Sequence, residues 1–194
     1  MKTDIIVSGV GGQGIVSIAA VIGEAALANG LFMKQSEVHG MSQRGGNVQS
    51  NLRISDAPIA SDLIPKGKAD LIISLEPMEA LRYLPYLKQD GWVITNAVPF
   101  DNIPNYPDLN DIMAEINKLP RKIVIDADKI AKEVGSVRAA NIVLLGTATP
   151  FLGISYDKIV GGIESIFKRK GQEIVELNLK ALEAGRRFSN KQIK

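Results

Sequence analysis

A glycine-rich segment near the start of the sequence has the spacing of a phosphate-binding turn. It reads Gly9-Val10-Gly11-Gly12-Gln13-Gly14 and matches the pattern G-x-G-x-x-G, between an apolar run and a stretch with helical spacing. Glycines allow a tight turn and a close approach of a ligand, and the N-terminus of a helix offers unpaired N–H groups to a phosphate. The alternative is that the glycines only permit close packing of a strand and a helix beneath a protein interface.

An acidic residue further along supports one interpretation of this turn. Glu37 stands about 20 residues after the last glycine, where dinucleotide-binding proteins place the carboxylate that holds a ribose. Binding of a nicotinamide or flavin dinucleotide is therefore one hypothesis. The sequence offers no evident partner for hydride transfer, and this weakens the hypothesis.

Several kinds of polar group gather in one loop, which reads Glu37-Val38-His39-Gly40-Met41-Ser42-Gln43-Arg44-Gly45-Gly46. Because it follows the second expected strand, it should lie near the glycine-rich turn, at the sheet edge where open α/β sheets bind ligands. Arg44 could hold a phosphate or a carboxylate through two hydrogen bonds. The alternative is that Arg44 pairs with Glu37 or with a partner subunit, and that His39 is merely hydrogen bonded. His39 as a general base is the weaker hypothesis, because no second acid–base group can be placed beside it.

Other polar residues at the same expected edge have simpler explanations. Asp126 and Asp128 follow a strand, and helix capping by Asp128 is favoured over a metal site or a general base because no third acidic residue is close. Asn96, Asn141 and Thr147 could contact a ligand or only close the local structure. We therefore expect no catalytic or metal-binding residue, and the candidate ligand-binding residues are Gly9, Gly11, Gly12, Gln13, Gly14, Glu37, His39, Gly40, Ser42, Gln43, Arg44, Gly45 and Gly46.

The composition excludes several classes of protein. The 194 residues contain no Cys and one His, which excludes disulfides, thiolate-held iron–sulfur clusters, zinc ribbons and cysteine nucleophiles. A formal net charge of +2 with dispersed basic residues argues against nucleic-acid binding. No stretch approaches the roughly 18 apolar residues of a membrane span, and the first residues lack the pattern of a signal peptide. We expect a soluble cytoplasmic protein without membrane contact.

Strands and helices are expected to alternate over most of the sequence. This predicts an α/β fold with an open, mostly parallel sheet, helices on both faces and a helical C-terminal part, in one domain over residues 1–194. The alternating polar pattern of the third strand predicts that it is half-exposed. The expected strands are 4–9, 31–36, 47–54, 69–75, 91–96 and 122–126, and the expected helices are 13–29, 78–84, 109–117, 127–134, 139–147, 155–169 and 172–188.

Two glycine-rich segments in this order are more specific than either alone. The N-terminal GVGGQGI and the later SEVHGMSQRGGNVQSNLRIS resemble the gamma subunit or domain of the 2-oxoacid:ferredoxin oxidoreductases. Residues 70–81, DLIISLEPMEAL, are also similar to a segment of that family, and the helical C-terminal part fits in length and pattern. The form His-Gly-Met-Ser-Gln-Arg-Gly-Gly resembles in particular the beta subunit of indolepyruvate ferredoxin oxidoreductase.

The resemblance implies a role within a larger enzyme. The family catalyses oxidative decarboxylation of a 2-oxoacid with coenzyme A, using thiamine diphosphate for the carbanion chemistry and iron–sulfur clusters to pass electrons to ferredoxin. This sequence has no Cys for a cluster and no Gly-Asp-Gly…Asn motif for Mg and diphosphate. These cofactors are therefore expected on an alpha-type partner subunit, and the isolated chain should be inactive.

For this chain, the resemblance implies a Rossmann-like gamma domain that packs against the thiamine-binding subunits and helps to form the coenzyme A site. Gly11, Gly12, Gln13 and the loop 39–46 are then the positions expected to contact coenzyme A or the interface. Ferredoxin would be reached through the complex, and contacts between two copies of the chain are compatible with this role.

Three hypotheses thus remain open. The chain is a non-redox subunit of a 2-oxoacid oxidoreductase, a self-sufficient NAD(P)- or FAD-binding oxidoreductase, or a pure interaction module without a small ligand. The first predicts a large partner, the second predicts saturable dinucleotide binding, and the third predicts an Arg44 that matters only for association.

Overall fold

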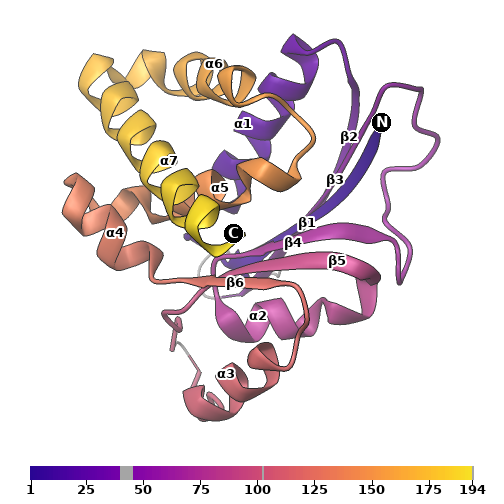
Figure 1. Ribbon diagram of the computed structural model, residues 1–194, viewed down its shortest axis with the longest axis vertical. Helices are drawn as coiled ribbons and strands as arrows, with labels where there is room; N and C mark the ends of the chain where they lie inside the picture. The colour runs from indigo at the N-terminus through magenta and orange to yellow at the C-terminus, as the bar shows by residue number, and fades with distance from the viewer. Residues whose placement is uncertain (40–45, 102, 194) are drawn as a thin grey trace.

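The computed structural model describes residues 1–39, 46–101 and 103–193, with the backbone alone at His39. Its strands form one six-stranded sheet with helices on both faces (Figure 1). The strands are β1 (Lys2–Val10), β2 (Phe32–His39), β3 (Asn47–Ser55), β4 (Ala69–Ser74), β5 (Leu87–Asn96) and β6 (Lys122–Ile125). The α-helices are α1 (Ile15–Ala28), α2 (Pro77–Arg82), α3 (Leu109–Asn117), α4 (Ala127–Val134), α5 (Ala140–Ala148), α6 (Tyr156–Phe167) and α7 (Gln172–Gln192). Short 3-10 helices are η1 (Leu84–Tyr86), η2 (Val137–Ala139), η3 (Thr149–Phe151) and η4 (Lys168–Lys170).

The strands follow the order β2-β3-β1-β4-β5-β6 across the sheet. The four strands from β1 to β6 in this order run parallel, whereas β3 is antiparallel to both of its neighbours. The predicted open, mostly parallel α/β sheet is therefore confirmed. β1 and β2 point the same way, but they are not neighbours, because β3 lies between them.

The prediction of a half-exposed third strand is wrong. β3 is paired on both sides, and its polar residues Ser50, Asn51, Arg53 and Ser55 are all buried. The alternation in its sequence arises because polar side chains find hydrogen-bond partners inside the fold, not because one face meets water.

The loop predicted to begin at Glu37 begins later. Pairing between β2 and β3 continues to the partners His39 and Val48, so Glu37, Val38 and the backbone of His39 belong to a strand. Ladder pairing with β3 thus overrides the polar composition that favoured a loop.

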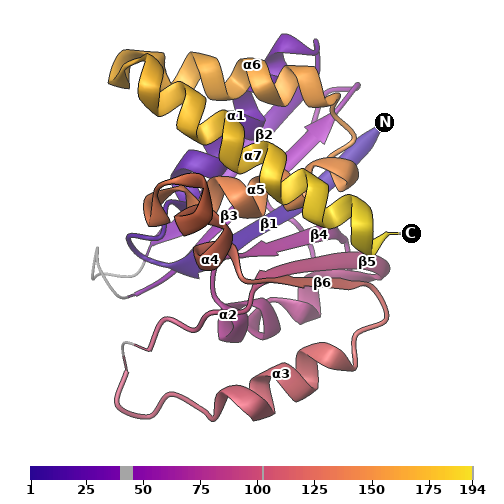
Figure 2. The ribbon, with the colours of Figure 1, turned by 60° about the vertical axis from the view of Figure 1, so that its left-hand side comes forward.

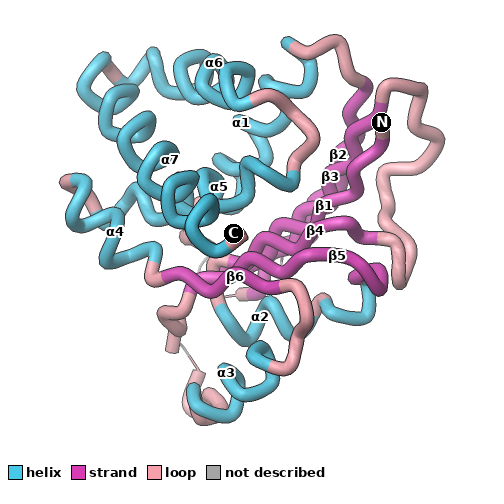
Figure 3. Tube along the Cα trace, in the orientation of Figure 1, coloured by secondary structure: helices cyan, strands magenta, loops and turns pink. Residues whose placement is uncertain are grey.

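The two faces of the sheet carry different sets of helices (Figures 1 and 3). α1, α4, α5, α6 and α7 cover one face and enclose the larger apolar core, to which the sheet contributes side chains such as Ile5 and Leu71. α2 covers the other face over a smaller cluster that includes Ile6, Ile72 and Val93, and α3 lies farther from the sheet (Figure 2). The helical C-terminal part packs back on the sheet.

Two glycines let α5 and α7 cross at close range. A Cβ atom on Gly185 would stand 1.9 Å from the carbonyl oxygen of Val143, and one on Gly146 would stand 2.0 Å from that of Leu182. No side chain fits at either position, because these separations are far shorter than a van der Waals contact. The crossing therefore brings residues 143–147 of α5 against residues 182–185 of α7.

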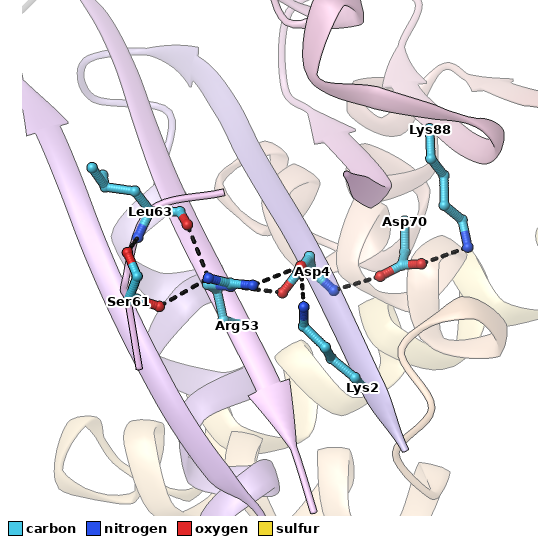
Figure 4. Close-up of polar contacts among 7 residues, drawn as sticks. All are labelled: Lys2, Asp4, Arg53, Ser61, Leu63, Asp70 and Lys88. Carbon is cyan, nitrogen blue, oxygen red and sulfur yellow. Dashed lines mark hydrogen bonds and ion pairs between the residues drawn. The ribbon is translucent and has the colours of Figure 1, made fainter. Parts of the chain in front are cut away.

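A buried ion pair between Asp4 and Arg53 stabilises the sheet at the amino ends of its parallel strands (Figure 4). Arg53 Nε and Nη2 donate to the carboxylate of Asp4 at 2.9 and 3.1 Å, and Arg53 Nη1 donates to the carbonyl oxygens of Ser61 and Leu63 at 3.0 Å each. Asp70 Oδ2 accepts from the backbone N–H of Asp4 at 2.7 Å. This network holds the connection between β3 and β4 against the sheet, at the edge opposite to the glycine-rich turn.

Candidate ligand-binding site

The glycine-rich turn between β1 and α1 is closed by its own glutamine. Gln13 Oε1 accepts from the N–H of Val10 at 2.7 Å, and Gln13 Nε2 donates to the carbonyl oxygen of Leu75 at 3.2 Å. The backbone N–H of Gln13 also donates to the carbonyl oxygen of Val10 at 3.1 Å. The side chain of Gln13 therefore joins the turn to the end of β4, and these bonds fix the position of the turn at the carboxyl edge of the sheet.

Two of the turn's glycines have conformations that other residues adopt at a cost. Gly12 has φ 104° and Gly14 has φ 89°. A Cβ on Gly14 would come within 2.4 Å of Asn141 Nδ2, whereas one on Gly12 would meet no atom of the described residues within 4 Å. Gly14 thus permits contact with the start of α5, and Gly12 leaves open space above the turn.

The backbone N–H groups in the first turn of α1 are the next feature of the turn that could contact a ligand. Within the described residues no side chain caps this 14-residue helix, and its N-cap is Gly14. The first N–H groups of a helix have no partner within the helix, and they carry a partial positive charge. The N–H of Gly11 is not free in the same way, because it donates to the carbonyl oxygen of Gly46 at 2.8 Å.

A cavity of about 710 Å³ opens beside the turn. This volume falls within the usual range of small-molecule sites. The lining mixes apolar side chains with a few polar and charged groups. It consists of Gly12, Gln13, Gly14, Ser17, Leu75, Asn96, Phe100, Asp128, Ser136, Val137, Arg138, Ala139, Ala140, Asn141, Phe167, Lys170, Ile174, Leu177 and Asn178.

The charged groups of this lining come from the helical part of the chain. Arg138 follows Ser136, whose hydroxyl accepts from the N–H of Arg138 at 3.3 Å and so begins η2. Lys170 lies at the end of η4, with its Nζ 5.3 Å from the centre of the Phe167 ring. Two cations and one carboxylate, Asp128, thus border a cavity that also exposes the turn, which suits an anionic ligand with an apolar part.

Asn96, at the end of β5, is hydrogen bonded to Asp128, in the first turn of α4 after β6. Asn96 Nδ2 donates to Asp128 Oδ2 at 2.7 Å, and Asn96 Oδ1 accepts from the N–H of Ala127 at 3.1 Å. The prediction that Asp128 caps the following helix is wrong. Asp126 is the cap of α4, because its Oδ1 accepts from the N–H of Lys129 at 2.8 Å.

Asn141 connects the turn to the helical part of the chain. Its Nδ2 donates to the carbonyl oxygen of Gly14 at 3.2 Å, and its Oδ1 accepts from the N–H of Ile142 at 2.9 Å. The sequence singled out Asn141 only as ambiguous, because nothing local indicates that α5 begins beside β1.

Glu37 lies away from the cavity. It belongs to β2, which β3 separates from β1, so about 10 Å lie between the two strands. Gln35 Nε2 donates to Glu37 Oε2 at 3.4 Å and to Ser50 Oγ at 3.1 Å. Glu37 does not line the cavity. This placement disfavours the hypothesis in which Glu37 holds the ribose of a dinucleotide bound at the turn.

The rest of the predicted loop falls largely outside the described residues. Gly40, Ser42, Gln43, Arg44 and Gly45 lie there, and so does the side chain of His39. Gly46 is described, and its hydrogen bond from Gly11 brings the end of the loop to the glycine-rich turn. Ligand contacts of the loop residues stay a prediction.

A second polar cluster, which the sequence did not predict, lies on the α2 face of the sheet. The buried Glu76 caps α2 through the N–H of Glu79 at 2.8 Å and accepts a hydrogen bond from the hydroxyl of Tyr106. Burial, followed by the hydrogen bond to Glu76, raises the pKa of Tyr106 well above its ordinary value. The contact ties the connection after β5 to α2, and this connection also carries Phe100 to the cavity. The only local signal is the cap position of Glu76 before Pro77.

The donor groups in the described part of the chain are not arranged as a metal or cluster site. Among the described residues, no group of three or more His, Cys, Asp or Glu side chains is arranged to hold a metal ion. The full sequence contains no Cys, so it offers no thiolate to an iron–sulfur cluster.

The fold and the cavity define an open α/β protein with a candidate ligand site at the carboxyl edge of its sheet. A family model described as pyruvate ferredoxin/flavodoxin oxidoreductase matches residues 4–188. The chain belongs to this family, as the sequence resemblance predicted. The expectation of an oxidoreductase subunit of this class is confirmed.

Relatives and solved structures agree with this assignment. The chain is 40% identical over 192 residues to the indolepyruvate oxidoreductase subunit IorB of Archaeoglobus fulgidus, covering 95% of this chain and 94% of that protein. The gamma subunit of a keto/oxoacid ferredoxin oxidoreductase from Geobacter sulfurreducens has a TM-score of 0.73 at 26% identity and covers 97% of this chain and 99% of its own. The 2-oxoglutarate:ferredoxin oxidoreductase of Magnetococcus marinus, solved with 2-oxoglutarate, coenzyme A and succinyl-CoA, has a TM-score of 0.77 at 21% identity. That match covers 98% of this chain but 31% of the larger one, and it supports the fold alone.

Proposed function

We propose that this chain is the subunit of an indolepyruvate-type 2-oxoacid:ferredoxin oxidoreductase that carries neither thiamine diphosphate nor a cluster. In this proposal residues 1–194 form one gamma-type domain, which supports oxidative decarboxylation by assembling with an alpha-type subunit and by forming part of the coenzyme A site. The observation that carries it is the cavity beside the glycine-rich turn, in a chain 40% identical to an IorB subunit.

The chemistry of the cavity supports coenzyme A as its ligand. Coenzyme A combines phosphate groups with a long, less polar arm. Arg138, Lys170 and the open N-terminus of α1 can bind phosphate oxygens, while Phe100 and Leu177 provide apolar contact. No described residue of this chain is assigned a covalent or redox step.

Partner subunits supply the remaining chemistry in this proposal. Thiamine diphosphate with Mg provides carbanion stabilisation when bound, and iron–sulfur clusters conduct electrons to ferredoxin. Neither fits the donor groups of the described residues, so both are assigned to the alpha-type partner. The isolated chain is therefore expected to be inactive.

The location of the protein is part of the proposal. None of the helices in the described part of the chain is both long enough and apolar enough to cross a membrane. A cytoplasmic location stays a prediction from the sequence.

Kinetics of the assembled enzyme test the assignment of the cavity. Arg138→Met and Lys170→Met, each co-expressed with the partner subunit, should raise the KM for coenzyme A about tenfold or more, because a charge-assisted hydrogen bond contributes roughly 1.5–3 kcal/mol. The KM for the 2-oxoacid should stay unchanged. Lys132→Met, an exposed lysine of α4 outside the cavity, is the matched control. An unchanged KM for coenzyme A in both cavity variants, with assembly intact, would refute the assignment.

A further inference from the structure

β2 forms the edge of the sheet, and its outer side is unpaired in the described part of the chain. Its eight residues pair with β3 only. An unpaired edge strand presents a row of N–H and C=O groups that another strand can join, and proteins commonly cover or block such edges. This edge has no proline and no bulge in its pairing with β3.

Two apolar side chains stand exposed on one face of this edge strand. Phe32 is 49% exposed and Val38 is 53% exposed. Met33 packs against the core beneath α1, so the odd-numbered residues of β2 point to that face and the even-numbered ones point to the other. Phe32 and Val38 therefore share the face that α1 does not cover, at equal distances from Gln35 along the strand.

We propose that β2 pairs antiparallel with β2 of a second copy of this chain, about a two-fold axis that passes through Gln35. A continuous sheet requires this axis to be perpendicular to the sheet. Residues directly opposite each other then point to the same face, so their numbers must be both even or both odd. With the axis at Gln35, Phe32 of each copy lies opposite Val38 of the other, and Lys34 lies opposite Ser36. The interface therefore buries Phe32 and Val38 of both copies, as a self-complementary two-fold contact does.

Other registers of the same pairing are less favourable. An axis at Lys34 sets two ammonium groups opposite each other, and an axis at Glu37 does the same with two carboxylates, which destabilises a strand pair. An axis at Ser36 sets Lys34 opposite Val38. Of these four registers, only the axis at Gln35 keeps the charges apart and sets Phe32 opposite Val38, and this pattern favours a second copy over an unrelated strand as the occupant.

Cysteine cross-linking tests the register directly, because the sequence contains no other Cys. In the double variant Phe32→Cys/Val38→Cys, each cysteine would lie opposite its counterpart, with Cβ atoms about 4.5–5.5 Å apart. Mild oxidation, or a short bis-thiol reagent, should therefore yield a covalent dimer of this chain on a non-reducing gel. The single variants are the matched controls, because equivalent residues of the two copies would be about 20 Å apart and should not cross-link.

The experiment is made on the chain alone and on the complex with its partner subunit. Cross-linking of the double variant well above both single variants, in either preparation, supports the proposed pairing. Cross-linking at the level of the single variants in both preparations overturns it, whatever the outcome for coenzyme A binding.

Sedimentation provides a second readout that does not depend on thiol geometry. Val38→Lys should raise the dimer dissociation constant at least tenfold, because it brings an ammonium group against Phe32 of the other copy. Ile103→Lys, at an exposed apolar residue on the segment before α3, should leave the constant unchanged, with folding of both variants checked by circular dichroism. Equal dissociation constants for the two variants overturn the proposal, and so does a wild-type chain that is monomeric alone and whose double variant does not cross-link above the single variants in the complex.

Discussion

Single residues at the glycine-rich turn hold the fold together as much as they prepare a site. Gln13 was predicted as a ligand contact, yet both ends of its amide are used within the protein, on Val10 and Leu75. Gly12 and Gly14 divide the roles, since one leaves open space and the other admits Asn141. The sequence predicted the turn from its spacing, but it could not reveal the partners, which are distant along the chain.

Gly14→Ala should destabilise the chain more than an alanine at another positive-φ glycine. A methyl group there combines an unfavourable φ with a collision against Asn141, and such strain costs on the order of 1–3 kcal/mol. Gly30→Ala is the matched control, because Gly30 has φ 70° and open space around it. Urea unfolding should give the lower free energy for Gly14→Ala, and equal values would contradict the role of the Asn141 contact.

The pKa of the buried Glu79 carboxyl should depend on Arg82, and titration can test this. Burial raises its pKa above the ordinary value, and the hydrogen bond from Arg82 at 2.9 Å opposes this shift. Arg82→Leu should raise the pKa of Glu79 further, and Arg82→Lys should do so less, as measured by carbon-13 NMR. Since the folded-state pKa is raised, the contribution of Glu79 to stability should fall as pH rises from the ordinary to the raised pKa. A pKa unmoved by Arg82→Leu would contradict the assigned cause.

At the scale of elements, the sequence predicted what local signals specify. The helices Leu109–Asn117 and Ala127–Val134 were predicted to the residue, because polar caps and helical spacing mark their limits. β3 was misjudged because its polar side chains have partners within the fold, such as Asp4 for Arg53 and Gln35 for Ser50, and no local pattern distinguishes this from exposure. Pairing likewise extended β2 into the predicted loop.

The ion pair between β1 and β3 should behave as a buried pair. Asp4→Ala would leave the Arg53 guanidinium buried without its carboxylate and should cost about 3–5 kcal/mol in the free energy of unfolding. The double variant Asp4→Leu/Arg53→Met removes both charges and should recover most of that loss. Urea unfolding of the three proteins checks this, and a double variant no more stable than Asp4→Ala would contradict it.

At the scale of the whole molecule, the cavity is a product of tertiary assembly. Its lining comes from the turn after β1, the end of β5 and the helices that follow β6. Residues such as Arg138 and Lys170 belong to no motif, so nothing in the sequence indicates that they lie near Gly12. The close crossing of α5 and α7, permitted by two glycines, helps to bring these segments together.

We propose that the cavity beside the glycine-rich turn binds coenzyme A in the assembled enzyme. Hydrogen exchange of the complex, measured by mass spectrometry with and without saturating coenzyme A, tests it most directly. We expect slower exchange in residues 12–17 and 136–141, with no change in α3, which lies on the other face. Unchanged exchange in both segments, at a coenzyme A concentration that saturates turnover, would contradict it.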